Sequence, residues 1–140
     1  MEERYGTSKL LDVLVVQELA ERLDAASSGA SPVVVNTANP GLCKSSLFRD
    51  IHAVGQFLVA GLTFLIGRTS EQGSRALMAA VEGGRESHGK YVDSGKVEDP
   101  SFFVLSEKGK AVQKKVWDEL MEILEGIEPG VTRSVTEATA

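Results

Sequence analysis

The spacing of hydrophobic residues in the first part of the chain predicts one long helix over residues 5–24. Apolar side chains are too frequent there to form a single narrow stripe, standing at Leu10, Leu11, Val13, Leu14, Val15, Val16, Leu19 and Leu23. A helix that is apolar on most of its sides is buried on most sides, or it packs against a second molecule. We therefore expect a central helix, or one that pairs with another chain.

A β-branched run, VVV at residues 33–35, follows a loop of small residues at 25–32. Together with Asn36 and Thr37 it predicts a short strand. Apolar residues at consecutive positions suit a parallel strand that is covered on both faces. Residues 39–46 predict a turn, in which Pro40 and Gly41 break the strand. Two strands alone are marginal, so we expect a sheet whose other strands this sequence does not contain.

Residues 47–67 again show a helical pattern. The apolar part, residues 53–67, is shorter than the roughly 20 residues that a helix needs to cross a bilayer. A buried helix is the prediction, and a segment lying on a membrane surface is the alternative.

The rest of the chain predicts two further helices. Thr69 and Gln72 have the spacing of a capping box, which starts a helix that ends near Gly83 and Gly84. Residues 89–103 suggest a short strand or an extended loop. A regular helix over residues 112–127 stops before Pro129, and residues 131–140 are expected to form a disordered tail. This order predicts an α/β fold that is mostly helical, with one or two strands and about four helices.

Composition narrows the function without fixing it. The chain has 140 residues, enough for one domain, and its formal net charge of −5 makes nucleic acid an unsuitable partner. A single cysteine, Cys43, rules out an internal disulfide, and no leader is visible, so we expect an intracellular and cytoplasmic protein. His52 and His88 have no supporting set of ligands, and we therefore expect no metal site.

Tyr5 and Lys9 carry the most suggestive chemistry. They stand four residues apart, so on a helix they lie one turn apart on the same face. An ammonium group beside a phenol favours the phenolate and suits the phenol to general acid–base catalysis. Two ordinary surface residues of a helix would have the same spacing, and the pair alone does not separate these interpretations.

The wider context of Tyr5 and Lys9 resembles the C-terminal half of the short-chain dehydrogenase/reductase family. The resemblance rests on YGTSK at 5–9, the apolar helix after it, the strand VVVNT and the turn NPG. The segments NPGLCKSSLFRD, RTSEQGSRAL and SHGKYVDSGKV look most like the retinol-dehydrogenase-like branch, and the likeness runs from residue 4 to about residue 130. The implied fold is the C-terminal part of a Rossmann-type, doubly wound parallel sheet.

The resemblance also implies roles for individual residues. Tyr5 matches the catalytic tyrosine, which exchanges a proton with the oxygen of an alcohol or carbonyl substrate. Lys9 matches the lysine that lowers the pKa of the tyrosine and binds the ribose of NAD or NADP. Pro40, Gly41 and Leu42 match the turn beside the nicotinamide, and Ser45 matches a hydroxyl residue that touches the cofactor. The segment from Leu47 to about Gly67 matches the family's variable substrate-covering region, which suits a bulky, apolar substrate.

The first half of such an enzyme is missing from this sequence. The 140 residues contain no glycine-rich turn for the cofactor pyrophosphate, and the family's catalytic serine and asparagine lack counterparts. We therefore expect a truncated oxidoreductase that is inactive alone. The alternative is a non-catalytic protein that pairs with an intact homologue, and either form could make homo- or hetero-oligomers through the helix 5–24.

Overall fold

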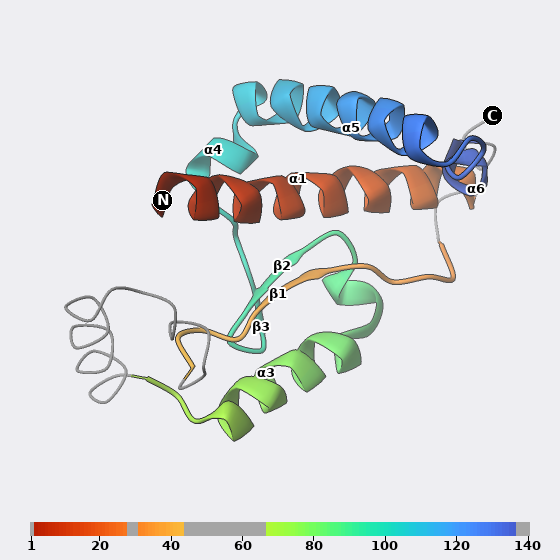
Figure 1. Ribbon diagram of the computed structural model, residues 1–140. Coiled ribbons are helices and arrows are strands. Elements are labelled where there is room, and N and C mark those ends of the chain that lie inside the picture. The colour runs from red at the N-terminus through yellow and green to blue at the C-terminus, as the bar shows by residue number, and fades with distance from the viewer. Residues whose placement is uncertain (1, 28–30, 44–66, 137–140) are drawn as a thin grey trace.

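The computed structural model describes residues 2–27, 31–43 and 67–136, which form stacked layers (Figure 1). Helix α1 (Glu2–Ala26) lies in the middle, between helix α5 (Glu107–Ile127) on one side and a small sheet on the other. Helix α3 (Ser70–Glu82) covers the opposite face of that sheet. The mostly helical α/β class expected from the sequence is confirmed.

Helix α1 confirms the prediction for residues 5–24 and extends it by a few residues at each end. Leu14 and Ala20 are buried along its middle, and the carboxylate residue Glu18 is buried with them. Because α1 packs against α5 and the sheet, apolar residues on more than one side of the helix find a partner. Leu11, which is 39% exposed, shows that this cover is incomplete near the N-terminus.

Among the described residues, the sheet has three short strands, one more than the sequence suggested. Strand β1 (Thr37–Asn39) pairs in parallel with β2 (Tyr91–Asp93), and β2 pairs in antiparallel fashion with β3 (Lys96–Glu98). The two-residue turn between β2 and β3 has positive φ angles at Ser94 and Gly95, as tight hairpin turns require. The described sheet is therefore mixed, with β1 at one edge.

The VVV run is not the strand, and this prediction is wrong. Val33 is 54% exposed and Val34 38% exposed, whereas the strand begins at Thr37. The backbone of Val35 bonds to groups outside a regular ladder: its N–H donates to His88 Nδ1, and its carbonyl accepts from the N–H of Gly89. A β-branched run favours a strand only where tertiary neighbours cover it.

The helix boundaries follow local capping chemistry. Thr69 forms the predicted capping box with Gln72, and α3 ends at Glu82 with Gly83 as its C-cap. A 3₁₀ turn, η2 (Gly84–Ser87), leads to β2, and the short helix α4 (Phe102–Leu105) leads to Ser106, which caps α5.

The predicted helix 47–67, including its apolar part 53–67, lies outside the described residues except for Gly67. Among the described helices, none has the length and apolar character needed to cross a bilayer.

The sequence placed residues 131–140 in a disordered tail, and the structure describes residues 131–136 of that segment. Arg133–Thr136 form a short helix, α6, and Thr132 is buried. The Glu125 carboxylate accepts hydrogen bonds from the backbone N–H groups of Gly130 and Thr132 and from the Thr132 hydroxyl. Glu125 thus folds the segment back after Pro129 has ended α5. Residues 137–140 lie outside the described part.

A polar network joins α1 to α5 inside the apolar interface. Gln113 is 1% exposed, and its Nε2 donates to the buried Glu18 Oε2 over 2.8 Å. Glu18 Oε1 accepts from Arg22 Nε at 2.9 Å, and the Arg22 guanidinium lies 4.9 Å from the centroid of the Trp117 ring. Each of these polar groups is satisfied by a partner, which fixes the register of the two helices.

A second network ties α1 to the segment before β1. The side chain of His88 is only 5% exposed. Its Nδ1 accepts from the Val35 N–H, so Nε2 carries the proton and donates to the Ala20 carbonyl at 3.2 Å. Asp24 accepts from the Arg85 guanidinium and from the Ser31 N–H. These contacts hold residues 31–35 against the C-terminal half of α1.

Replacing Gln113 with alanine should destabilise the α1–α5 interface. The change removes the donor to buried Glu18 and leaves a carboxylate oxygen without its partner, at a cost of about 2 kcal/mol. Urea unfolding followed by the fluorescence of Trp117 measures the loss. Lys114→Ala, at the exposed neighbouring position, is the matched control and should change the free energy of unfolding by much less. Equal effects of the two changes would contradict the role given to Gln113.

Acid should destabilise the fold through two carboxylates. The hydrogen bond from Arg85, followed by that from the Ser31 backbone, lowers the pKa of Asp24. The backbone N–H of Gly130, followed by the Thr132 hydroxyl and N–H, lowers the pKa of Glu125. A lowered folded pKa contributes stability that is present above the unfolded value, about 4, and is lost as pH falls through the folded value.

Urea unfolding between pH 6 and pH 3 tests this. The free energy of unfolding should fall below about pH 4, and Asp24→Asn should flatten part of that fall. Arg85→Gln, which removes the partner and keeps the carboxylate, should flatten it as well. A fall that is equally steep in both variants would show that the Asp24–Arg85 contact does not contribute.

Candidate active site

The first turns of α1 place three polar side chains on one face. Tyr5, Lys9 and Asp12 follow the spacing i, i+4 and i+7, which returns to the same side of a helix. Tyr5 is 60% exposed, and the Lys9 Nζ lies 5.9 Å from the centroid of its ring. The predicted pair is therefore adjacent, with the ammonium within cation–π distance of the phenol.

Lys9 forms a hydrogen-bonded ion pair with Asp12, which lies three residues further along the helix, on the opposite side of Lys9 from Tyr5. Its Nζ lies 3.1 Å from Asp12 Oδ2, in a pair whose two side chains are more than half exposed. The hydrogen bond and the negative charge of Asp12 raise the pKa of Lys9, and the nearby Tyr5 acts in the same direction. The ammonium is therefore charged across the neutral range, and its position is set by two neighbours on its own helix.

The Pro-Gly turn follows directly from β1 and is held by Asn39. The Asn39 side-chain oxygen accepts from the Gly41 N–H at 3.0 Å, while its amide nitrogen donates to Asp93 Oδ1 at 2.7 Å. Gly41 has a φ of +78°, in the left-handed region that suits glycine. Leu42 then accepts a hydrogen bond from the Arg68 N–H, which brings the two flanks of residues 44–66 together. The turn thus has a defined shape at the carboxyl end of β1.

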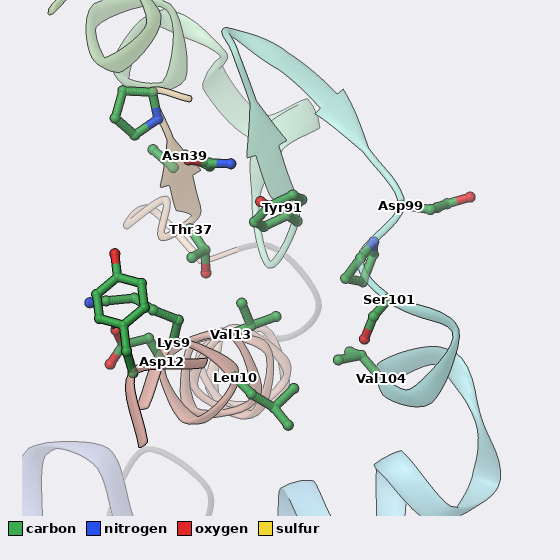
Figure 2. A pocket seen from close by; sticks show the side chains of 14 residues that line it. Lys9, Leu10, Asp12, Val13, Thr37, Asn39, Tyr91, Asp99, Ser101 and Val104 are labelled. Atoms are coloured by element: carbon green, nitrogen blue, oxygen red, sulfur yellow. The ribbon is translucent and has the colours of Figure 1, made fainter. Parts of the chain in front are cut away.

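A cavity of about 640 Å³ lies between the start of α1 and the end of β1. Figure 2 shows Val13 pointing from α1 toward the sheet, the Thr37 hydroxyl pointing from β1 toward α1, and Asp99 pointing away. The lining residues come from α1, from β1 and the turn that follows it, from β2, and from residues 99–104, which lead into and include part of α4. They are Tyr5, Lys9, Leu10, Asp12, Val13, Thr37, Ala38, Asn39, Pro40, Tyr91, Asp99, Pro100, Ser101 and Val104. This volume is large enough for part of a cofactor or a small substrate.

The structure brings together part of the predicted set of site residues. Tyr5, Lys9 and Pro40 line the same cavity, although Pro40 is 31 residues beyond Lys9 in the sequence. Gly41 and Leu42 stand in the turn that continues from Pro40 and are not among the lining residues. Ser45 lies outside the described residues. The catalytic and cofactor-binding roles of these residues stay predictions.

Several lining residues were not singled out by the sequence. Asp12 could have been found, because it lies seven positions after Tyr5 on the same face of the predicted helix. Tyr91 could not, because it reaches the cavity through the parallel register that places it opposite Thr37. Ser101 likewise reaches the wall only because β3 and α4 position the segment between them.

The cysteine takes a structural position, and no metal-ligand cluster is found among the described residues. Cys43 is half-buried, and its Sγ lies 3.7 Å from the Pro40 carbonyl, to which it donates. In the part of the chain that the structure describes, no three His, Cys, Asp or Glu side chains gather where they could hold a metal ion.

Comparison with known proteins shows similarity to one group of enzymes. The chain is 40% identical over 134 residues to a short-chain dehydrogenase of Penicillium roqueforti, with 94% of this chain and 35% of that protein aligned. It is 43% identical over 131 residues to a short chain dehydrogenase/reductase of a Cryptosporiopsis species, covering 94% of this chain and 39% of the relative. A short-chain dehydrogenase/reductase of Aspergillus flavipes is 35% identical over 136 residues, covering 97% and 38%.

These curated relatives are longer than the chain, which spans a little more than a third of their length. No family model matches the chain. No solved structure matches it either. Over nearly its whole length, the chain is therefore similar to part of proteins that are named short-chain dehydrogenases/reductases.

Proposed function

We propose that this chain provides the proton-transfer pair and the nicotinamide-side turn of an NAD(P)-dependent short-chain dehydrogenase/reductase. One observation supports this most directly: Tyr5 and Lys9 line the same cavity as Pro40, at the carboxyl end of β1. In open α/β sheets, ligands bind at the carboxyl ends of the strands. The similarity to curated enzymes of this name supports the same assignment.

The residues present suit the nicotinamide end of such a cofactor. Pro40, Gly41, Leu42 and Ser45 would border the nicotinamide, and the Lys9 ammonium would donate hydrogen bonds to the ribose hydroxyls. When bound, the cofactor supplies hydride transfer to or from the substrate carbon.

In the proposed mechanism, Tyr5 exchanges the proton at the substrate oxygen. Its hydroxyl gives its proton to the carbonyl oxygen in reduction, and in oxidation its deprotonated phenolate oxygen takes the proton of the alcohol. The Lys9 ammonium stabilises the negative charge that develops on the Tyr5 oxygen when its proton leaves. A bulky, apolar alcohol or carbonyl compound is the proposed substrate, in line with the resemblance to the retinol-dehydrogenase-like branch.

We further propose that catalysis needs a nucleotide-binding half in addition to these 140 residues. The sequence contains no glycine-rich turn to hold a pyrophosphate at the start of a helix. Catalytic residues that act as a unit have strongly non-additive effects, so Tyr5 and Lys9 without the remaining groups should give little rate enhancement.

Fusing the chain to the nucleotide-binding half of a curated relative tests the assignment. The chain alone should show no saturable binding of NADH or NADPH, and the fusion should bind one of them and reduce a carbonyl substrate. Tyr5→Phe should lower kcat/KM of the fusion by about 10²- to 10⁴-fold, because the transferable proton is gone. A fusion that binds the cofactor and keeps its activity after Tyr5→Phe would contradict the role of Tyr5.

Lys9→Ala is a second, independent test of the same site. It should lower kcat/KM and weaken cofactor binding, since both the charge and the ribose donors are lost. Lys115→Ala is the matched control, because Lys115 is also an exposed helical lysine paired with a carboxylate on its own helix, Glu119. Tight binding of NADH or NADPH by the chain alone would overturn the proposal that a second half is needed.

We also propose that a second copy of the chain binds along α1. A groove of about 530 Å³ runs between α1 and α5, lined mainly by aliphatic side chains. These are Leu11, Val15, Val16, Val116, Leu120 and Ile123, with Asp12 and Glu119 beside them. Ile123 is 59% exposed, and an apolar groove of this kind is typical of an interaction surface.

Light scattering after size exclusion measures this association. Ile123→Lys should shift the chain toward the monomer, because it places a charge in the apolar groove. Val81→Lys, at an exposed apolar position on α3 that is 77% exposed, is the matched control and should leave the mass unchanged. A monomeric parent chain, or equal effects of the two changes, would contradict pairing through this groove.

A further inference from the structure

Lys9 stands between two functional groups on one helix face. Tyr5 lies one turn before it and Asp12 about one turn after it, and all three line the 640 Å³ cavity. Asp12 Oδ2 accepts from Lys9 Nζ at 3.1 Å, while the Tyr5 ring centroid lies 5.9 Å from the same nitrogen. An ammonium has three N–H donors, so the contact with Asp12 leaves two for other acceptors.

We propose that Asp12 is a positioning residue that anchors Lys9 from its C-terminal side and leaves the two other N–H groups for Tyr5 and the cofactor ribose. This inference rests on the proposed function. A lysine side chain has several rotatable bonds, and holding it in one place costs conformational entropy. With the carboxylate already holding the ammonium, less of that cost remains when the cofactor binds.

The contact is poorly explained as a device for stability. Both side chains are more than half exposed, and ion pairs at such positions on a helix contribute little to folding. Asp12 should therefore affect the position and the charge of Lys9 more than it affects the stability of the fold. Asp12 itself lines the cavity, so the anchor keeps Lys9 beside the cavity.

The charged and titratable residues that line the cavity with Lys9 come from three parts of the chain. Tyr5 and Asp12 belong to α1, Tyr91 belongs to β2, and Asp99 lies before α4. Figure 2 shows that Asp99 points away from the cavity, which leaves Asp12 as the anion of this set beside Lys9. The hydrogen bond and charge of Asp12 raise the pKa of Lys9 and keep the ammonium charged further into the alkaline range.

The first test uses the 140-residue chain itself. Acetylation of Lys9 by acetic anhydride, resolved by peptide mass spectrometry over a pH series, reports when the amine loses its proton. Asp12→Asn should move the labelling of Lys9 to lower pH, and Asp12→Glu should restore part of the parent profile. Glu71→Gln, which removes another exposed helix ion pair, with Arg75 on α3, is the matched control and should leave the profile of Lys9 unchanged.

The second test uses the fusion described above. Asp12→Asn should raise the Kd for NADH or NADPH by about threefold and move the alkaline limb of kcat/KM to lower pH. A purely structural role would lower activity at every pH without moving that limb. If the unmutated fusion binds neither NADH nor NADPH, the proposed function is refuted. The labelling of Lys9 in the 140-residue chain would still decide the role of Asp12. An Asp12→Asn variant whose labelling profile matches that of the parent overturns the inference.

Discussion

The packing of α1 on two sides is the constraint on which the rest of this structure depends. Leu14 is fully buried in its middle, α5 covers one flank, and the sheet lies against another. Since α1 is shared by both packing layers, a shift of this helix would disturb the α1–α5 interface and the sheet together. The same helix carries Tyr5 and Lys9 at its beginning, so its packing also fixes where the candidate site lies.

Buried polar contacts define the position of α1 more narrowly than apolar packing alone would. Gln113 reaches Glu18 across the interface with α5, and His88 bridges the Ala20 carbonyl to the backbone of Val35. Each contact needs a particular partner atom at hydrogen-bond distance, whereas aliphatic side chains can slide past one another. The segment that leads into β1 is thereby fastened to α1, and the Pro-Gly turn comes to lie beyond the start of that helix.

The candidate site therefore combines a rigid scaffold with exposed reactive groups. Tyr5 and Lys9 project from the first turns of a helix whose middle is firmly packed. Asn39 shapes the opposite wall by holding Gly41 on one side and Asp93 on the other. This division is compatible with the proposed function, in which the chain would contribute a proton-transfer pair and one border of a cofactor site.

Local signals in the sequence determined the three long helices and the turn after β1. The capping box at Thr69 and Gln72, the regular spacing of α5 and the Pro40–Gly41 pair act within a few residues, so they can be read directly. The pairing of Tyr5 with Lys9 follows from the helix period in the same way. Tertiary structure decided the rest, because the deciding partners are distant in sequence. Val35 bonds to His88 instead of forming a ladder, Thr37 pairs with Tyr91, and Pro40 joins Tyr5 and Lys9 in one cavity only after α1 and the sheet have packed together.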